Sequence, residues 1–377
     1  MKHVTLAVVI LFVSFGGIQP QAQNATPAPK SSAVEALDGL DPVLLIQGKE
    51  VQGKASFAVV QGRFNYLFSS ADTKATFERD PAKYEIQNGG MCARMGKTAG
   101  GNPSDFMVHE GKIYVFGSDE CHRKFQAAPQ KYLAPAAVAF PTARSALTRG
   151  RELLDRVAKS FGSAQQMEGL TSYVETIAQT QKRMNADVPV VTKTSWLFPG
   201  FVRQERTMTF QGKTMGGTAI VSPEGLWFVT QSGQVYPNPP AARPSVEQDF
   251  GRHPIALLRA AHDPTLKVAA VGSTTIDGKK VEQVRIVRGA VDVVMNVDWA
   301  GHLHSLTFKD RGPDGDYGTY ALLYSDFRDV KGLKLPFAVQ GSFNGEPDSL
   351  QTWTVESIAL NAPLEKSLFA PPSTVTR

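Results

Sequence analysis

A long series of short β-prone segments separated by turn signals fills the chain beyond Leu170 and constrains its fold more than any other feature. Apolar and polar residues alternate along these segments, which is typical of strands with one buried face. Turn pairs such as Gln211-Gly212 and Asn344-Gly345 stand between the segments and favour tight connections. The pattern predicts antiparallel strands at residues 172–179, 193–198, 203–210, 218–221, 226–230, 280–287, 291–298, 303–309, 317–328, 337–343 and 351–360.

Two predicted helices accompany these strands. Residues 149–161 place their apolar side chains on one face, and Gly162 ends that helix. Residues 246–262 form the second candidate helix, in which Ile255, Leu257 and Leu258 are apolar. Many antiparallel strands with few helices indicate an α+β fold, in which a strongly curved antiparallel half-barrel sheet carries the helices against its hollow side.

Several segments of this strand-rich part carry a family resemblance: 196–205, 224–227, 253–258, 326–332, Leu335-Pro336 and 369–372. Through them, residues 145–377 resemble the periplasmic lipoprotein-carrier (LolA/LolB-like) family. The resemblance implies a half-barrel whose hollow takes acyl chains or another apolar ligand. The large apolar residues that would line such a hollow, or else form ordinary core, are Trp196, Phe198, Phe201, Trp227, Phe228 and Leu258.

The stretch from residue 36 to residue 133 contains an internal repeat. Residue types recur at an offset of 48 (114 minus 66): Tyr66, Phe68, Ser70, Phe77, Pro81, Lys83 and Tyr84 return as Tyr114, Phe116, Ser118, Phe125, Pro129, Lys131 and Tyr132. Each copy is expected to form a strand and then a serine-capped helix that the proline ends. The copies differ where Cys121-His122 replaces Thr73-Lys74, and the packing of the shared residues does not account for this difference.

Segments 37–43, 89–93 and 114–125, together with Tyr84, resemble a YHS domain that covers residues 36–133. The resemblance implies a small α+β module of a kind often associated with heavy-metal handling. Leu44 stands where metal-linked members of the family tend to carry a cysteine. The soft donors that remain suit Cu(I) best, with Zn as the second choice. The candidate ligands are Cys92 and Cys121, helped by His122, Met95 or His109.

Cys92 and Cys121 are the two cysteines of the chain. In an oxidising compartment they would form one disulfide, which stabilises a fold by about 3–4 kcal/mol on the chain-entropy estimate. Binding of Cu(I) or Zn and a pair of free thiols are the alternatives, and the sequence leaves all three open. Cys121 is expected near the start of a helix capped by Ser118, where the helix dipole favours a thiolate.

The first residues are typical of a secretory leader. A positive start is followed by an apolar run at 4–15, which is shorter than the roughly 20 residues that a membrane-spanning helix needs. We therefore expect a signal peptide at 1–23, a flexible tether at 24–35, the YHS-like domain at 36–133, an Ala/Pro linker at 134–144 and the half-barrel domain at 145–377. No cysteine follows the apolar run, and no later segment is apolar enough to span a membrane. The expected product is a soluble periplasmic or extracellular protein.

Charge and motifs narrow the function. The net charge of +5 comes from scattered Lys and Arg residues, which argues against nucleic-acid binding. No sequence motif of a serine hydrolase, a zinc protease or a paired-carboxylate enzyme occurs. The sequence favours a non-enzymatic exported protein that binds an apolar or lipidic small molecule. Handling of Cu(I) or Zn through Cys92 and Cys121 is the alternative, and nothing in the sequence specifies an oligomeric state.

Overall fold

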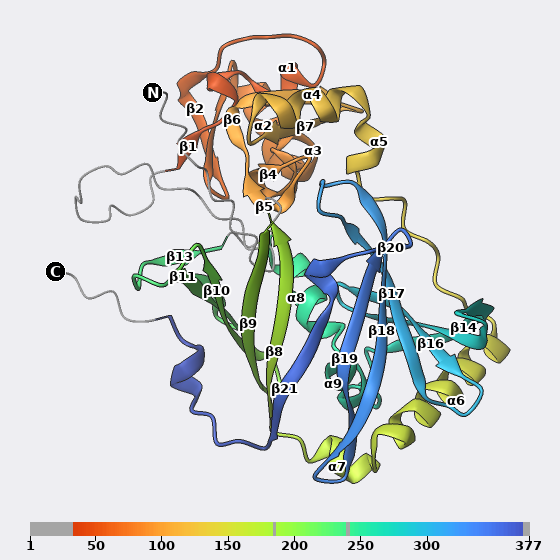
Figure 1. The fold of residues 1–377 in the computed structure, drawn as a ribbon. Coiled ribbons are helices and arrows are strands. Elements are labelled where there is room, and N and C mark those ends of the chain that lie inside the picture. Colours follow the sequence, from red (N-terminus) through yellow and green to blue (C-terminus); the bar gives the residue numbers. More distant parts are fainter. Residues whose placement is uncertain (1–32, 184–185, 239–241, 372–377) are drawn as a thin grey trace. The chain divides into compact units, whose positions relative to one another are not determined.

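The computed structural model describes residues 33–183, 186–238 and 242–371, which divide into two compact units on either side of the bond between Leu133 and Ala134 (Figure 1). The predicted signal peptide at 1–23 and the tether up to residue 32 lie outside the described residues. Within the described ranges, no helix is both long enough and apolar enough to cross a membrane.

The first unit contains two copies of one motif, a β-hairpin followed by two helices. The first copy comprises β2 (Lys54–Gln61), β3 (Phe64–Phe68), α2 (Ala71–Arg79) and α3 (Pro81–Tyr84). The second copy comprises β6 (Asn102–His109), β7 (Lys112–Phe116), α4 (Asp119–Ala127) and α5 (Pro129–Tyr132). Every boundary of the second copy lies 48 residues after its counterpart, which is the offset of the sequence repeat. Each proline not only ends the longer helix but also occupies the first position of the short one, where its missing N–H costs nothing.

Shorter elements complete two small sheets in this unit. One sheet has the strand order β1-β3-β2 and the other has the order β5-β4-β7-β6. β4 runs parallel to β7 and antiparallel to β5. The elements outside the two copies are β1 (Val34–Glu35), η1 (Leu37–Gly39), α1 (Pro42–Leu45), η2 (Gln87–Gly90), β4 (Met91–Cys92) and β5 (Gly96–Gly100).

The second unit is built on one fourteen-stranded antiparallel sheet. Its strands follow the order β13-β12-β11-β10-β9-β8-β21-β19-β18-β17-β16-β15-β14, and β20 pairs with β19. The strands are β8 (Ser172–Arg183), β9 (Ala186–Leu197), β10 (Phe201–Phe210), β11 (Lys213–Ser222), β12 (Gly225–Thr230), β13 (Val235–Pro237), β14 (Lys267–Ile276), β15 (Lys279–Arg288), β16 (Val291–Asp298), β17 (Leu303–Arg311), β18 (Tyr317–Val330), β19 (Leu333–Phe343), β20 (Glu346–Pro347) and β21 (Trp353–Leu360). The helices and 3-10 turns are α6 (Arg144–Phe161), α7 (Ala164–Glu168), α8 (Arg243–Gly251), α9 (Pro254–Arg259), η4 (Ser349–Gln351) and η5 (Lys366–Phe369).

The elements differ from the sequence expectations at several places. The short elements α7, β13 and β20 were not expected, and β9 begins at Ala186 instead of residue 193. Two further differences have a clear physical cause. The single helix expected at 246–262 is two helices, because His253 adopts an extended backbone and caps α9, and Pro254 cannot donate the N–H that would continue α8. The strand β14 was not predicted, because its second half is exposed on both faces and lacks the alternation of buried and exposed residues. A strand of this kind forms because β15 pairs with it along its length.

The sheet curves around α8 and α9, and two side-chain contacts join α8 to distant strands. Phe250 of α8 lies with its ring centroid 6.4 Å from that of Trp196 in β9. Arg252, two residues later, lies 4.0 Å over the ring of Phe308 in β17. From β9 to β17 the strand order takes five steps, which would span about 24 Å in a flat sheet. These contacts place α8 against strands on both halves of the sheet, and Figure 1 shows the sheet bending around α8 and α9, which lie on its concave side. The predicted curved α+β architecture is confirmed.

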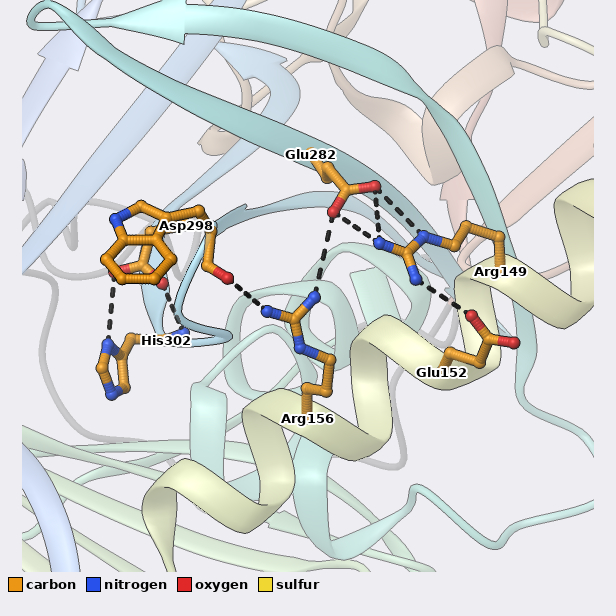
Figure 2. Close-up of polar contacts among 7 residues, drawn as sticks. Arg149, Glu152, Arg156, Glu282, Asp298 and His302 are labelled. Carbon is orange, nitrogen blue, oxygen red and sulfur yellow. Dashed lines mark hydrogen bonds and ion pairs between the residues drawn. The ribbon is translucent and has the colours of Figure 1, made fainter.

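The helix α6 packs on the edge strand β14, at Gly150. A Cβ atom added to Gly150 would lie 2.5 Å from the Cα atom of Ala269, so only glycine permits this approach. Figure 2 shows how two arginines of α6 add polar contacts: Arg149 pairs with Glu282 of β15, at 2.7 Å, and Arg156 reaches Glu282 and a carbonyl of the β16–β17 turn. The helix thus covers the first half of this edge strand, near Ala269, whereas its second half stays exposed.

Candidate functional site

The concave face of the sheet is the first candidate site, and strand register identifies the side chains on it. Directly paired residues on neighbouring strands point to the same face. A row of such pairs begins at Tyr173, which contributes to the core beneath α8 and α9. The row runs from β8 to β12 through Tyr173, Trp196, Val202, Val221 and Leu226.

Trp196 is the centre of an aromatic cluster at this row. Its ring centroid lies 5.4 Å from that of Tyr173 and 5.0 Å from that of His253, and Phe250 meets it edge-on. The residue is only 6% exposed. Its indole Nε1–H is buried and has no hydrogen-bond partner among the residues that the structure describes. A buried tryptophan N–H usually finds an acceptor, so this position is one at which a bound molecule could supply an oxygen.

A buried carboxylate lies beside this cluster. The Tyr173 hydroxyl donates a 2.7 Å hydrogen bond to Oε2 of Glu175, and Nε2 of His253 lies 3.6 Å from the same oxygen. Nδ1 of His253 accepts the N–H of Ile255 and so caps α9. Burial raises the pKa of Tyr173 well above its usual value, which keeps the phenol protonated as the donor. The concave face therefore combines a large apolar surface with a few fixed polar groups.

Polar side chains also form a band across the concave face, one to two residue pairs away from Trp196. Thr192, Thr194 and Arg206 are buried there, and the Gln204 amide donates to the Thr194 hydroxyl at 3.2 Å. Beyond the band, the same face is apolar again, with buried Val188, Val190 and Met208. The concave face thus changes from apolar to polar and back to apolar along the strands, and most of the side chains that make up this pattern are buried.

The structure divides the six residues that the sequence assigned to the hollow. Trp196 and Phe228 share the concave face, and Leu258 is buried in α9. Phe198 follows β9 and lies under the guanidinium of Arg259, at 4.7 Å.

Phe201 and Trp227 lie on the opposite face of the sheet. Phe201 pairs with Leu197, and Trp227 pairs with Ile220; both pairs alternate with the concave row. The C-terminal segment covers them, since the ring centroid of Phe369 lies 5.8 Å from that of Phe201. These two aromatic residues belong to a separate core cluster and cannot line the hollow.

Cys92 and Cys121 form the second candidate site, in the first unit. The structure describes both cysteines, and they are unbridged. A hydrogen bond from the Cys92 thiol lowers the pKa of Cys121, and the Ser118 hydroxyl and the Arg94 guanidinium, whose Nη1 lies 3.7 Å from the sulfur, act in the same direction. Together these groups outweigh burial and bring the pKa of Cys121 to about 5. The same hydrogen bond, together with burial, raises the pKa of Cys92. The disulfide predicted from the sequence therefore stays a prediction, and the fold places the two cysteines in one buried cluster.

The other predicted metal ligands do not complete a cluster. Nδ1 of His122 lies 2.5 Å from Oδ1 of Asp105, and its ring stacks on Phe116 at 4.4 Å. His109 meets Phe125 edge-on, and Met95 packs partly buried against the cysteine cluster. Among the described residues, no group of three or more His, Cys, Asp or Glu side chains is placed to hold a metal ion.

Three residues of these sites were missed in the sequence. Arg94, Glu175 and His253 are charged or titratable groups that the fold carries to the thiol pair and to Trp196. Glu175 lies in a strand whose residues alternate between apolar and polar, and His253 precedes a proline. Neither pattern indicates that these two side chains are buried and not on the surface. Only Arg94 had a local signal, since it stands two residues after Cys92.

Comparisons with known proteins find a partial likeness. No family model matches the chain, and no curated protein matches it. A LolA superfamily protein from Nitrosomonas europaea is 12% identical, with a TM-score of 0.40 over 59% of this chain and 97% of that one. A domain assigned to outer-membrane lipoprotein sorting, from Vibrio parahaemolyticus, is 10% identical, with a TM-score of 0.39 over 59% and 97% of the two chains. A DUF1329 family protein from Desulfovibrio piger is 12% identical, with a TM-score of 0.37 over 60% and 98%.

Proposed function

We propose that the second unit binds an apolar or lipidic ligand on the concave face of its sheet, and that the protein is an exported binding protein rather than an enzyme. The buried Nε1–H of Trp196, for which the described residues provide no acceptor, carries this proposal. An ester or carboxyl oxygen of an amphiphile would satisfy this donor while its chain covers the neighbouring apolar side chains. The first unit would act as an accessory domain.

The test uses a fluorescent fatty acid, dansyl-undecanoate, titrated into the full-length protein. Trp196→Phe keeps an aromatic ring but removes the N–H, and loss of one hydrogen bond of about 1 kcal/mol weakens binding roughly fivefold. Trp227→Phe is the matched control, because Trp227 lies on the opposite face under the C-terminal segment. We expect the control to bind like the wild type.

Two results would refute this proposal. A wild-type protein that leaves the probe in the buffer and yields no lipid on solvent extraction has no such site. Equal weakening by both tryptophan substitutions would place the effect in general stability rather than at the concave face.

We propose a second candidate function, binding of Cu(I) between Cys92 and Cys121, because these two soft donors share one buried cluster. Cu(I) accepts two thiolate ligands, so the pair fits it. Zn requires about four ligands, and the described residues around the pair do not supply them. Elemental analysis after anaerobic loading should find one copper per chain in the wild type and none in Cys121→Ser; equal copper in both would reject the site.

A further inference from the structure

Comparison of the two repeat copies shows that the second copy lacks half of a helix-capping box, at Cys121. In the first copy, Thr73 closes a capping box: its N–H donates to the Ser70 hydroxyl at 3.2 Å, and its own hydroxyl faces the Ser70 N–H at 3.4 Å. In the second copy, Cys121 occupies the same position of α4, and only the bond from its N–H to Ser118 is made. Cys121 thus stands where a threonine side chain completes the capping box in the first copy, while the backbone elements of the two copies have matching bounds.

A cation and two donors surround the Cys121 sulfur. The buried Arg94 places Nη1 3.7 Å from this sulfur and 3.9 Å from a carboxylate oxygen of Glu120. Cys92 and Ser118 direct hydrogen-bond donors to the same atom. Donors and a cation that converge on one sulfur stabilise it as a thiolate, which is the form that attacks a disulfide.

The two cysteines differ in access. Cys92 is 0% exposed, in β4, whereas Cys121 is 7% exposed, in the first turn of α4. Both residues are buried, and Cys121 is the one that keeps some exposed surface, so we expect a reagent to reach it first. Cys92 belongs to the same buried cluster as Cys121 and can therefore react with it afterwards.

We infer that Cys92 and Cys121 are a redox-active dithiol that reduces a disulfide of a partner molecule, with Cys121 as the attacking residue and Cys92 as the resolving residue. This inference concerns the first unit and does not depend on ligand binding by the second unit. The Cys121 thiolate attacks one partner sulfur; a mixed disulfide forms and the other partner sulfur leaves as a thiolate. Cys92 passes its proton to that thiolate and its sulfur attacks Cys121, which releases the remaining partner sulfur as a thiolate. The partner gains two electrons, and the cysteine pair loses two and becomes a bridge.

The experiment exposes the reduced, full-length protein to glutathione disulfide in the presence of a metal chelator, followed by acid quenching, alkylation and intact-mass measurement. The wild type should form an internal bridge without an adduct. Cys92→Ser should accumulate one glutathione adduct on Cys121, because the resolving thiol is absent. Cys121→Ser should react at least about tenfold more slowly than Cys92→Ser, because the remaining thiol is buried and its thiolate is not stabilised.

Arg94 provides a further control. Arg94→Gln should slow adduct formation on Cys121 in the Cys92→Ser background, while Arg94→Lys should retain most of the rate because it keeps the positive charge. Circular dichroism of each variant separates slow chemistry from unfolding. Equal adduct formation in the two cysteine variants, or a wild type that stops at the mixed disulfide, would overturn the inference. The chelator keeps this outcome separate from that of the copper test.

Discussion

The contact between α8 and β16 yields a prediction in which one substitution changes sign with its background. Gly251 ends α8, and a Cβ atom added there would lie 2.6 Å from Cγ2 of Val291 in β16. Carbon atoms in contact prefer about 3.5–4.0 Å, so one element must move by about 1 Å. Val291 is 4% exposed and has little room to move.

The expected magnitude is the balance of two effects. Replacing glycine with alanine in a helix stabilises by up to about 1 kcal/mol, whereas overpacking a tight core costs about 1–3 kcal/mol. Gly251→Ala should therefore lower the free energy of unfolding by about 1 kcal/mol in the wild type. In a Val291→Ala background the clashing methyl is gone, and the same substitution should be neutral or stabilising by up to about 1 kcal/mol.

Urea unfolding followed by tryptophan fluorescence measures this cycle, because all four tryptophans lie in the second unit. The coupling free energy between Gly251 and Val291 should be about 1–3 kcal/mol. If Gly251→Ala has the same effect in both backgrounds, α8 does not press on β16. The close packing of α8 on β16 at Gly251 would then not contribute to holding α8 against the sheet.

Three further predictions concern single groups. Asp41→Ala removes a buried helix cap and should destabilise the first unit by about 2–4 kcal/mol, measured by far-ultraviolet circular dichroism in urea. Glu282→Gln breaks the partly exposed pair with Arg149 and should change stability by no more than about 1 kcal/mol, with an effect that shrinks in high salt. Alkylation of Cys121 by iodoacetamide should stay fast down to about pH 6 and slow as the pH falls through about 5. Cys92→Ala should move the midpoint of this pH profile upward. A wild-type midpoint near pH 8.5, the ordinary value of a free cysteine, would contradict the contact between the two thiols.

The parts of the fold that depend on local sequence were predictable. The repeat offset of 48 reproduces every element boundary of the two copies in the first unit. Serine caps and prolines act within one turn of the chain, so their effect can be inferred without the tertiary structure. The same is true of most strands in the second unit, whose alternation arises from one buried face.

The faces of the sheet were less predictable, because they depend on register between strands. Alternation shows that Trp196 and Leu197 point to opposite faces, but not which face of β12 continues the one that carries Trp196. The pairing of Trp196 with Val202, and of Trp227 with Ile220, decides this, and it separates the two tryptophans. Register follows from turn geometry and from packing over long sequence distances, which a residue pattern does not contain.

Departures from internal symmetry locate function more sharply than the conserved positions of the repeat. The shared aromatic residues and serine caps serve packing in both copies, so they carry no information on chemistry. Cys121 and His122 replace Thr73 and Lys74 on the same backbone, and each makes a contact that the first copy lacks: Cys121 with Cys92, and His122 with Asp105 through Nδ1. The substitution at Cys121 sacrifices half of a capping box, which selection for stability alone would retain. The thiol pair is therefore the feature of the first unit that stability does not explain.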